Sequence, residues 1–242
     1  MKRYRVPAKG KLNLKAYDPD ETGDYKKTDQ GKDKAKADTA KLIARLAGLQ
    51  ERLYANATRS LLIVLQGMDT SGKDGTIRSV MSGINPQGCN VVAFKAPSKD
   101  ELARDFLWRV HREVPPKGHI GIFNRSHYED VLVTRVHGWV SDAVARQRFK
   151  QIKEFEELLH ENGTVILKFF LHISKAEQKE RLEARIADPE KRWKWNSGDL
   201  EERRYWDKYM QAFEDVLSAT STRSEEHTSE LQSRGLISYA VF

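Results

Sequence analysis

Short runs of consecutive apolar residues alternate with segments of helical periodicity along most of this chain. The apolar runs lie at residues 61–66, 90–94, 119–123 and 164–171. Each run is short and mostly apolar, which predicts a strand covered on both faces, as in a parallel sheet. Helices are predicted between the runs, at residues 73–83, 99–113 and 141–161. This alternation predicts an α/β domain in which a parallel sheet lies between helical layers.

The chain before this alternating region has a different pattern. Residues 1–28 are polar and are interrupted by Pro and Gly, which predicts an extended arm over the surface. A helix is predicted to begin near Lys32, and its apolar stripe at helical spacing consists of Leu42, Leu46, Leu49 and Leu53. The stripe is too short for sustained heptads, so it predicts packing against the core rather than a coiled coil.

Charged helices follow the last apolar run. They are predicted at residues 175–187 and at about 200–217, on either side of a break at Asp188-Pro189 and a basic segment that contains Trp193 and Trp195. In nucleotide kinases a helical insert of this kind is the lid that closes over the phosphates.

The first apolar run leads directly into a loop bracketed by glycines, Gly67-Met68-Asp69-Thr70-Ser71-Gly72-Lys73. A strand, a glycine loop, a lysine and a helix in this order are typical of the phosphate-binding loop (P-loop). Its backbone N–H groups and the helix N-terminus face an anion, and Lys73 reaches the anion's oxygens. A chance match of the spacing is the alternative, which the strand before the loop and the helix after it disfavour. Asp74 stands where a magnesium-binding Ser or Thr usually follows the lysine.

A second motif follows the run at residues 119–123. It reads Asn124-Arg125-Ser126-His127-Tyr128-Glu129-Asp130. In P-loop enzymes a second strand usually delivers a carboxylate beside the loop, where the carboxylate holds magnesium or its water. Asn124 cannot be an anionic ligand, so Glu129 or Asp130 is expected to share that role.

Together these motifs resemble the second family of polyphosphate kinases, which transfer phosphoryl groups between inorganic polyphosphate and nucleotides. The resemblance extends from Val6 to about Thr222. It includes the blocks Asn85-Pro86-Gln87-Gly88, Phe94-Lys95-Ala96-Pro97-Ser98, Asp105-Phe106-Leu107-Trp108-Arg109 and Arg192-Trp193-Lys194-Trp195. The block that begins at Asn124 is similar to the subgroup that phosphorylates both AMP and ADP, because other subgroups carry Asp at that position.

The resemblance implies a fold and a set of site residues. The expected fold is a P-loop kinase-like three-layer sandwich, with an arm and helix at residues 1–55, a core at 56–222 and a lid at about 174–200. The expected catalytic residues are Asp69, Lys73, Arg125 and Asp130. Substrate binding is expected from Gly67, Thr70, Gly72, Lys95, Asn124, Glu129, Arg181, Arg185, Arg192 and Lys194. The expected cofactor is Mg²⁺, or Mn²⁺ in its place, held by Asp69, Asp74 and Asp130.

Several of these residues have a second interpretation. Asp69 is alternatively a turn residue that caps the following helix. Arg125, whose planar fork suits a phosphate, is alternatively paired with Glu129 or Asp130. His127 is expected to form a positioning hydrogen bond rather than to act as a nucleophile.

Three further interpretations concern the lid and the one cysteine. The pair Arg181 and Arg185 lies on one helix face and either points into the cleft or serves solubility. Trp193 and Trp195 are expected to pack the lid hinge, with stacking on adenine as the alternative. Cys89 is expected to be structural.

Composition agrees with this interpretation. The 242 residues are enough for one α/β domain, and the formal charge of +7 suits a protein that binds a polyanion. No helix-turn-helix, zinc-finger or RNA-binding signature favours nucleic acid as that polyanion. No apolar run approaches the roughly 18–20 residues that span a membrane, and no signal segment is visible, so a cytoplasmic location is expected. The resemblance also implies a homo-oligomer, a dimer or a tetramer.

The last twenty or so residues do not fit the family. The segment from Arg223 to Ser233 reads as the codon-by-codon translation of a common sequencing-library adapter, which indicates that residues 223–242 are a non-native tail. The resemblance implies that the family's chain continues with one more strand and a closing helix. We therefore expect both to be missing, an unpaired sheet edge, and a chain that is poorly stable or aggregates.

Two other functions remain compatible with the sequence. One is an ATP-dependent nucleoside or nucleotide kinase, which the loop permits but Asp74 and the second motif disfavour. The other is a non-catalytic protein that binds polyphosphate or nucleic acid and keeps the loop only as part of its fold.

Overall fold

The computed structural model describes residues 4–7, 10–221 and 227–232. Five parallel strands form one sheet in this part of the chain, in the order β2-β3-β1-β4-β5. The strands are β1 (Ser60–Gln66), β2 (Cys89–Ala93), β3 (Ile120–Asn124), β4 (Thr164–Leu171) and β5 (His227–Gln232). The predictions for β1 to β4 are confirmed to within one residue at each end.

Strand β5 corrects one prediction about the C-terminal segment. It pairs in parallel with β4 from Ile166 to Leu171, so the sheet edge that we expected to be unpaired is paired over this stretch. Ladder hydrogen bonds join backbone groups, so an extended segment can cover the edge whatever its side chains are. Residues 223–226 and 233–242 of the predicted tail lie outside the described residues, and the expected low stability stays a prediction.

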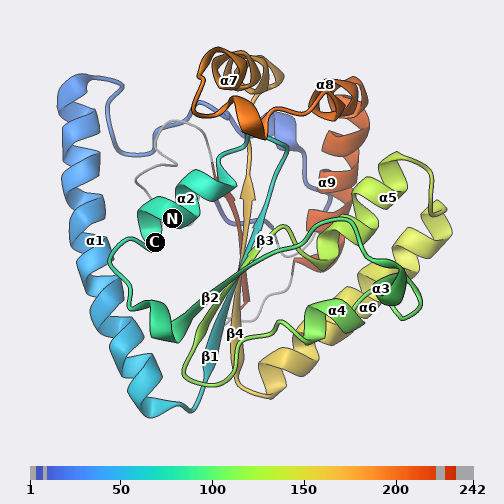
Figure 1. Cartoon of the computed structure of the whole chain (residues 1–242), viewed down its shortest axis with the longest axis horizontal. Helices are drawn as coiled ribbons and strands as arrows, with labels where there is room; N and C mark the ends of the chain where they lie inside the picture. The colour runs from blue at the N-terminus through green and yellow to red at the C-terminus, as the bar shows by residue number, and fades with distance from the viewer. Residues whose placement is uncertain (1–3, 8–9, 222–226, 233–242) are drawn as a thin grey trace.

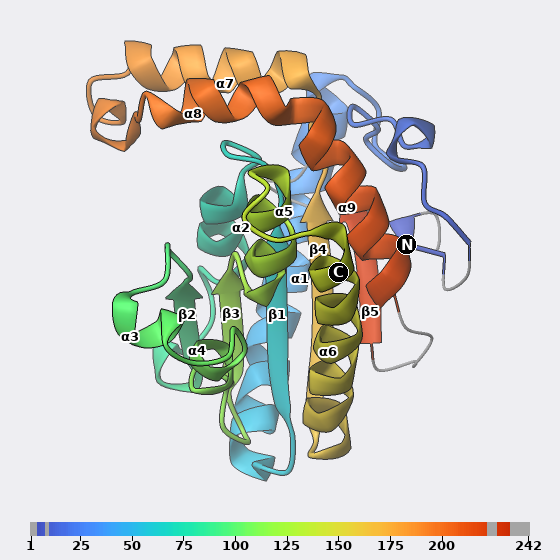
Figure 2. The same cartoon turned by 90° about the vertical axis from the view of Figure 1, so that its right-hand side faces the viewer.

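Helices cover both faces of the sheet and one of its ends. In Figure 1, α1 (Asp29–Asn56) and α2 (Lys73–Val80) lie on one face, and α6 (Asp142–Glu161) and α9 (Trp206–Thr220) lie on the other. In Figure 2, α7 (Lys175–Ala187) and α8 (Gly198–Glu202) extend across the carboxyl ends of the strands. The predicted three-layer α/β fold is confirmed, and the lid lies over the sheet end where α/β proteins bind ligands.

The short helices complete the connections between these elements. They are η2 (Leu14–Ala16), η3 (Pro86–Gly88), α3 (Lys99–Leu102), α4 (Trp108–His111), η4 (His127–Val131), α5 (Val133–Val136), η5 (Arg192–Lys194) and η6 (Arg203–Tyr205). Among the described residues, no helix combines the length and the apolar character that a membrane crossing requires.

The two faces of the sheet have separate apolar cores, because successive strand residues point to opposite sides. Leu62 and Val64 of β1 pack among the side chains of α6 and α9. Ile63 and Leu65 pack on the other face, against α1 and α2. This double coverage explains why the strands read as continuous apolar runs rather than as alternating ones.

Three predicted helices differ from the structure in their extent. The helix predicted at residues 73–83 ends earlier, at Val80. The helix predicted at residues 99–113 is divided into α3 and α4, and the Asp105 carboxylate accepts a hydrogen bond of 3.0 Å from the Leu107 amide in the gap. Such a side-chain contact competes with helical hydrogen bonds and accounts for the break. The helix predicted at about 200–217 is likewise divided into α8, η6 and α9.

The N-terminal arm and α1 contribute to the cores unevenly. Leu12 and Leu14 are buried, and their amides donate hydrogen bonds of 2.8 Å to Ser218 Oγ and Glu214 Oε1 of α9. On α1, Leu46 and Leu53 pack against the sheet as expected. Leu49 does not, since 49 % of it is exposed, so the predicted stripe is wrong at that position. The buried face of α1 runs through Gln50 instead.

Candidate active site

The loop between β1 and α2 has the strained backbone of a P-loop. Gly67 has φ +154°, Thr70 has φ +63° and Gly72, the N-cap of α2, has φ +102°. A Cβ atom at Gly67 would lie 2.7 Å from Ser71 Oγ and 2.8 Å from the Leu171 carbonyl oxygen, so only glycine fits there. The loop thus turns tightly at the carboxyl end of β1 and presents the start of α2.

Lys73 lies at the base of this loop and is almost fully buried, with 8 % of it exposed. Its ammonium donates hydrogen bonds to the carbonyl oxygens of Gly67 (2.8 Å) and Met68 (3.1 Å), and lies 3.4 Å from Ser71 Oγ. Burial lowers the pKa of Lys73, and the nearby Asp69 carboxylate opposes that shift. Lys73 is therefore buried and fixed by hydrogen bonds, at the position from which P-loop lysines contact phosphate.

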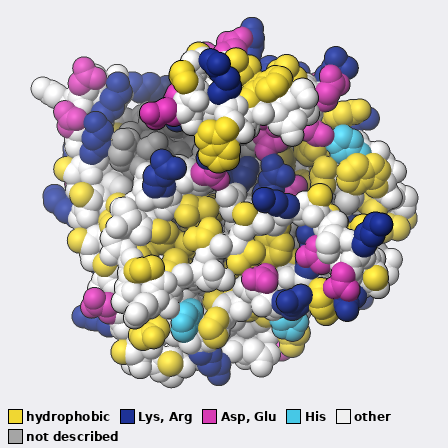
Figure 3. Space-filling model, in the orientation of Figure 1, with side chains coloured by type: hydrophobic (Ala, Val, Ile, Leu, Met, Phe, Trp, Pro, Cys, Tyr) yellow, Lys and Arg dark blue, Asp and Glu magenta, His cyan; other side chains and the backbone are white. Residues whose placement is uncertain are grey.

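A cavity of about 880 Å³ opens in front of the loop, between the sheet end and the lid; we call it the cationic cavity. Its charged lining residues are the cations Lys73, Lys95, Arg125, Arg181, Arg185, Lys191 and Lys194 and the carboxylates Asp69 and Asp74. Figure 3 shows Lys and Arg side chains gathered below the lid on this face of the molecule. Because the cations greatly outnumber the carboxylates, the cavity suits a ligand with several negative charges.

The lid contacts the P-loop directly. Arg181 of α7 donates a hydrogen bond of 2.8 Å to the Thr70 carbonyl oxygen, and Gln178 of the same helix donates one of 3.2 Å to the Asp69 carbonyl oxygen. Arg185, one turn further along, pairs with Asp199 at 3.2 Å. Both predicted lid arginines thus line the cavity, as the interpretation in which they point into the cleft expects.

Asn124, at the end of β3, connects the second motif with the P-loop. Its amide donates a hydrogen bond of 2.8 Å to Asp74 Oδ1, and Lys194 of the lid lies 3.1 Å from Asp74 Oδ2. Burial tends to raise the pKa of Asp74, but the hydrogen bonds from Asn124 and Lys194 outweigh it and lower that pKa. The neutral amide of Asn124 therefore stabilises the charged form of the Asp74 carboxylate.

A second cavity, of about 150 Å³, lies on the other side of Arg125. It shares Asp69 and Arg125 with the cationic cavity, and its remaining lining residues are Gly67, Met68, Glu129, Leu132, Val133, Glu202, Tyr209 and Phe213. The pKa of Glu129 is raised by burial, although Arg125 and Lys73 oppose the shift. The lining of this smaller cavity is apolar and acidic, whereas the lining of the cationic cavity is mainly basic.

Arg125 and Asp69 form the boundary between the two cavities. The Arg125 guanidinium donates a hydrogen bond to Asp69 Oδ1, and the two groups form an ion pair. The alternative in which Arg125 pairs with Glu129 or Asp130 is therefore wrong. Asp69 does not cap α2 either, because that helix has no side-chain cap.

Two predicted site residues lie apart from both cavities. Asp130 faces Arg109, with 3.7 Å between the carboxylate and guanidinium atoms, and lines neither cavity. Residues 129 and 130 project differently because the 3-10 helix η4 rotates successive side chains by about a third of a turn. Arg192 donates to the Ile186 carbonyl oxygen at 3.1 Å, and its neighbour Lys191 lines the cationic cavity in its place.

Four other residues that the sequence singles out lie outside the two cavities. His127 is buried, and its Nε2 lies 3.3 Å from Glu156 Oε1, which agrees with a positioning role. Trp193 is 77 % exposed, so its expected packing role is wrong, and Trp195 is also exposed. Cys89 is a half-buried free thiol at the start of β2.

The sequence did not single out Glu202 and Tyr209, which line the second cavity. The Tyr209 hydroxyl donates a hydrogen bond of 2.7 Å to Glu202 Oε2, and His137 Nε2 lies 2.9 Å from Glu202 Oε1. Nothing in the sequence signals this arrangement, because the residues come from α8 and α9, far along the chain from the motifs.

The oxygen donors beside the loop suit a hard cation such as Mg²⁺. Asp69 and Asp74 both line the cationic cavity, where substrate phosphates would supply further ligands. Among the described residues, no cluster of three or more Asp, Glu, His or Cys side chains has the geometry of a metal site. Mg²⁺ is usually bound through one or two carboxylates plus substrate phosphates rather than in an all-protein cage, so the donor set fits.

Comparison with known proteins identifies this P-loop and lid arrangement. The sequence model of the family described as Polyphosphate kinase 2 (PPK2) matches residues 29–227. The chain belongs to the polyphosphate kinase 2 family. The match includes the loop, the second motif and the whole lid, so both cavities lie inside the family's domain.

Relatives of known name agree with this assignment. The AMP/ADP-polyphosphate phosphotransferase of Meiothermus ruber is 54 % identical over 222 residues, which cover 92 % of this chain and 82 % of that protein. The ADP-polyphosphate phosphotransferase of Rhodopseudomonas palustris is 52 % identical over 192 residues, 74 % of this chain and 66 % of that one.

A crystal structure shares the fold. The polyphosphate kinase 2 of Arthrobacter aurescens is 43 % identical, with a TM-score of 0.91, over 98 % of this chain and 83 % of that one. This agreement confirms that the P-loop, the parallel sheet and the helical lid are arranged as in the polyphosphate kinase 2 family.

Proposed function

We propose that this chain transfers phosphoryl groups from inorganic polyphosphate to AMP and to ADP, forming ADP and ATP. The observation that carries the proposal is the cationic cavity, in which seven Lys and Arg side chains surround the P-loop. A cavity of this charge suits a polyanion, and the P-loop suits a phosphate that reacts. The names of the relatives indicate polyphosphate as the donor and AMP and ADP as the acceptors.

The proposed reaction is a direct, in-line transfer. An oxygen of the acceptor's terminal phosphate attacks the terminal phosphorus of polyphosphate, and the bond from that phosphorus to the next bridging oxygen breaks. The shortened polyphosphate leaves with the bonding electrons. The attacking phosphate oxygen is already charged near neutral pH, so no general base and no covalent enzyme intermediate are required.

The cationic side chains have three distinct roles in this proposal. Lys73 contacts the phosphate that binds the P-loop. Arg125 lies between the two cavities, where its planar fork stabilises the charge that spreads over the transferred group. The lid cations Arg181, Arg185 and Lys194 bind the rest of the polyanion and exclude water from the reacting group.

Asp69 and Asp74 are the residues that would hold Mg²⁺. Bound there, the ion would neutralise part of the charge on the phosphates. Asp69 also keeps Arg125 in place through their ion pair, so it has a role that is independent of the metal.

A coupled assay tests the proposal. Purified chain is given Mg²⁺ and long-chain polyphosphate, with AMP and ADP supplied separately, and wild type is compared with Lys73→Ala and Arg125→Ala. We expect nucleotide products from both acceptors and a loss of about 100-fold or more in each variant. The matched control is Lys150→Ala, which removes an exposed lysine of α6 whose side chain is 78 % accessible.

The other outcomes select other functions. Phosphorylation of a nucleoside or nucleotide by ATP, without activity on polyphosphate, would establish an ATP-dependent kinase. Polyphosphate binding without turnover, unchanged by Lys73→Ala, would establish a non-catalytic protein. If wild type gives no product, replacing residues 223–242 with the corresponding residues of the Meiothermus relative separates an effect of the predicted non-native tail from a wrong assignment.

A further inference from the structure

A buried ion pair lies behind the loop that carries Arg125. Lys168 of β4 and Glu156 of α6 are 6 % and 1 % exposed, and 2.6 Å separates Lys168 Nζ from Glu156 Oε2. The Tyr128 hydroxyl donates a hydrogen bond of 2.8 Å to Glu156 Oε1, and His127 Nε2 lies 3.3 Å from the same oxygen. One carboxylate thus holds two consecutive residues of η4.

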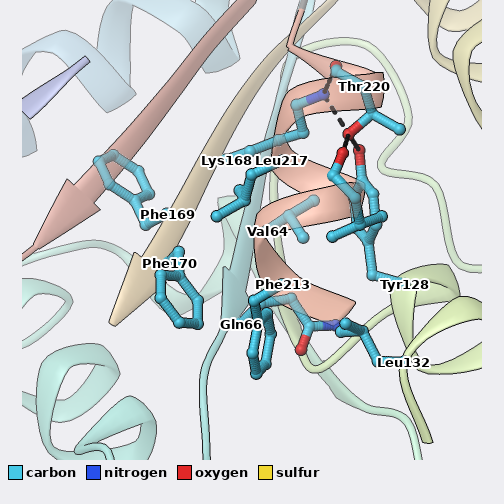
Figure 4. Close-up of a pocket in the computed structure, with 11 residues that line it drawn as sticks. Val64, Gln66, Tyr128, Leu132, Lys168, Phe169, Phe170, Phe213, Leu217 and Thr220 are labelled. Atoms are coloured by element: carbon cyan, nitrogen blue, oxygen red, sulfur yellow. Dashed lines mark hydrogen bonds between the residues drawn. The ribbon is translucent and has the colours of Figure 1, made fainter. Parts of the chain in front are cut away.

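The network also reaches the end of α9. Lys168 donates hydrogen bonds to the Thr220 carbonyl oxygen (2.9 Å) and to the Tyr128 hydroxyl (3.1 Å). The Tyr128 hydroxyl lies 3.1 Å from Thr220 Oγ1. Figure 4 shows Lys168, Tyr128 and Thr220 converging in this way. The turn after Arg125 is therefore bound to three separate elements, α6, β4 and α9.

The surroundings of this ion pair are otherwise apolar. Val64, Phe170, Phe213 and Leu217 line a cavity of about 20 Å³ beside Lys168 (Figure 4). A buried ion pair in such a place is seldom a net source of stability, because desolvating two charges costs about as much as their attraction returns. A second role for the pair is therefore worth testing.

Glu156 stays charged in this environment. Burial by itself raises its pKa, but Lys168 and His127 outweigh burial and lower the pKa to about 2. A charged carboxylate accepts stronger hydrogen bonds than a neutral one, so its hold on Tyr128 is firm at neutral pH.

The backbone of Arg125 explains why a firm hold matters. Arg125 has φ +63°, a left-handed conformation that non-glycine residues rarely adopt and that is strained. Its amide is fixed on one side by a hydrogen bond of 3.1 Å to the Leu65 carbonyl oxygen. On the other side, η4 begins at His127, one residue beyond Ser126. Without anchors on both sides the backbone could relax and move the guanidinium.

We propose that Glu156, paired with Lys168, is a positioning residue for Arg125. Its carboxylate fixes His127 and Tyr128, and through them the left-handed turn that directs the Arg125 guanidinium at Asp69 between the two cavities. The role rests on the proposed phosphoryl transfer, in which Arg125 contacts the transferred group. Neither Glu156 nor Lys168 touches the substrate in this proposal.

A double-mutant cycle tests this role. Glu156→Gln is measured alone and combined with Arg125→Ala, by initial rates with polyphosphate and ADP. We expect Glu156→Gln to lower kcat by about 10- to 100-fold with little change in KM, since a displacement of about 1 Å can cost that much. In the Arg125→Ala background, the same substitution should change kcat by less than about 2-fold, because the group that Glu156 positions is already absent.

Two further variants keep the test decisive. Glu156→Gln/Lys168→Met removes both charges together, so it leaves no unpaired buried charge and is expected to fold even if the single variant does not. Asp215→Asn is the matched control: it breaks an ion pair of 2.7 Å between α9 and Arg135, away from the Arg125 turn. All rates are measured well below the melting temperature that circular dichroism gives for each variant, so that folded fractions are equal.

The outcomes separate the inference from the proposed function. If the loss from Glu156→Gln or from the double variant is as large in the Arg125→Ala background as in wild type, Glu156 has only a structural role and the inference fails. Additivity is the expected result for Asp215→Asn. A chain that forms no ATP from polyphosphate, even after residues 223–242 are replaced as described above, overturns the proposed function itself, and the inference with it.

Discussion

The Arg125 guanidinium and the Asp69 carboxylate form an ion pair that joins the end of β3 to the P-loop. Strands β1 and β3 are direct neighbours in the sheet, so their carboxyl ends deliver the two residues to the same place. Both side chains are partly exposed and line both cavities. The pair therefore holds the arginine where a phosphoryl group passing between the cavities would meet it.

The first prediction concerns the shape of the Arg125 side chain. Arg125→Lys keeps the charge but loses the planar fork, so we expect kcat to fall by about 100-fold or more while KM changes by less than about 5-fold. Initial rates over a range of polyphosphate and ADP concentrations measure both. Arg104→Lys, at an exposed pair with Asp100 outside the cavities, is the control and should retain full activity. Near-normal kcat in Arg125→Lys would show that charge alone suffices.

The second prediction concerns the lid cation Lys194. It lies 3.1 Å from Asp74 across the cationic cavity and is partly exposed. We expect Lys194→Ala to raise KM for polyphosphate by about 3- to 10-fold with little change in kcat, because a lid cation binds ground and transition states alike. The wild-type KM should also rise more steeply with salt than that of the variant, since one phosphate contact is lost.

Lys179→Ala provides the comparison for the lid. Lys179 is on the same helix as Arg181 and pairs with Glu183, but it does not line the cavity. Its KM and its salt dependence should match those of wild type. Equal effects of the two substitutions would mean that only the overall charge of the lid matters.

The third prediction compares two glycines. Gly67→Ala forces a Cβ to within 2.8 Å of the Leu171 carbonyl oxygen at a residue with positive φ, so the free energy of unfolding should fall by about 2 kcal/mol or more. Gly48→Ala, inside α1 with no atom within 4 Å of the added Cβ, should raise it by about 0.5–1 kcal/mol. Urea unfolding followed by tryptophan fluorescence measures both. A change of the same sign in the two variants would contradict the argument.

The fourth prediction is the pH dependence of stability that Glu156 causes. Its pKa in the folded chain, about 2, lies below the ordinary value of 4.5, so folding favours the charged form. The stabilisation is complete above about pH 5 and is lost as the pH falls through the window from about 4.5 to about 2. Urea unfolding at about pH 5.5, 4.5 and 3.5 should give a free energy of unfolding that decreases as the pH falls.

The double variant Glu156→Gln/Lys168→Met isolates this contribution. The variant lacks the carboxylate, so it should take up about one proton fewer than wild type when it unfolds in the acid range. Its free energy of unfolding should therefore fall less steeply than that of wild type as the pH decreases. Parallel slopes for wild type and variant would show that other carboxylates cause the acid sensitivity.

Local pattern was sufficient for most of the fold. The four apolar runs predicted four strands, and an apolar stripe at helical spacing predicted α1, because burial on both faces and burial on one face leave different periods in a sequence. The position of α6 between two apolar runs and the charged character of α7 predicted those two helices. The misses have local causes. The Asp105 side chain breaks the helix predicted at residues 99–113, and Leu49 is exposed although it lies at helical spacing from Leu46 and Leu53.

The residues of the candidate site also differ in how far the sequence predicts them. Lys73 was recognisable because a P-loop needs its residue types at fixed spacing. Asp69 and Arg125 were expected from the resemblance to the family, in which the loop and the second motif carry these residues. Asp130 was not separable from Glu129, because the rotation of η4 decides which of the two side chains faces the cavities. Glu202 and Tyr209 left no signal, since their place in the site depends on how α8 and α9 pack.

The sequence by itself determined the elements, the P-loop and the family, because each depends on residue types at short, regular spacing. Only the tertiary structure decided which side chains meet. It paired Arg125 with Asp69, set Asn124 against Asp74, and buried Lys168 beside Glu156. These contacts join residues far apart along the chain, and their geometry follows from the order of the strands and the packing of helices on the sheet. No local periodicity encodes that order.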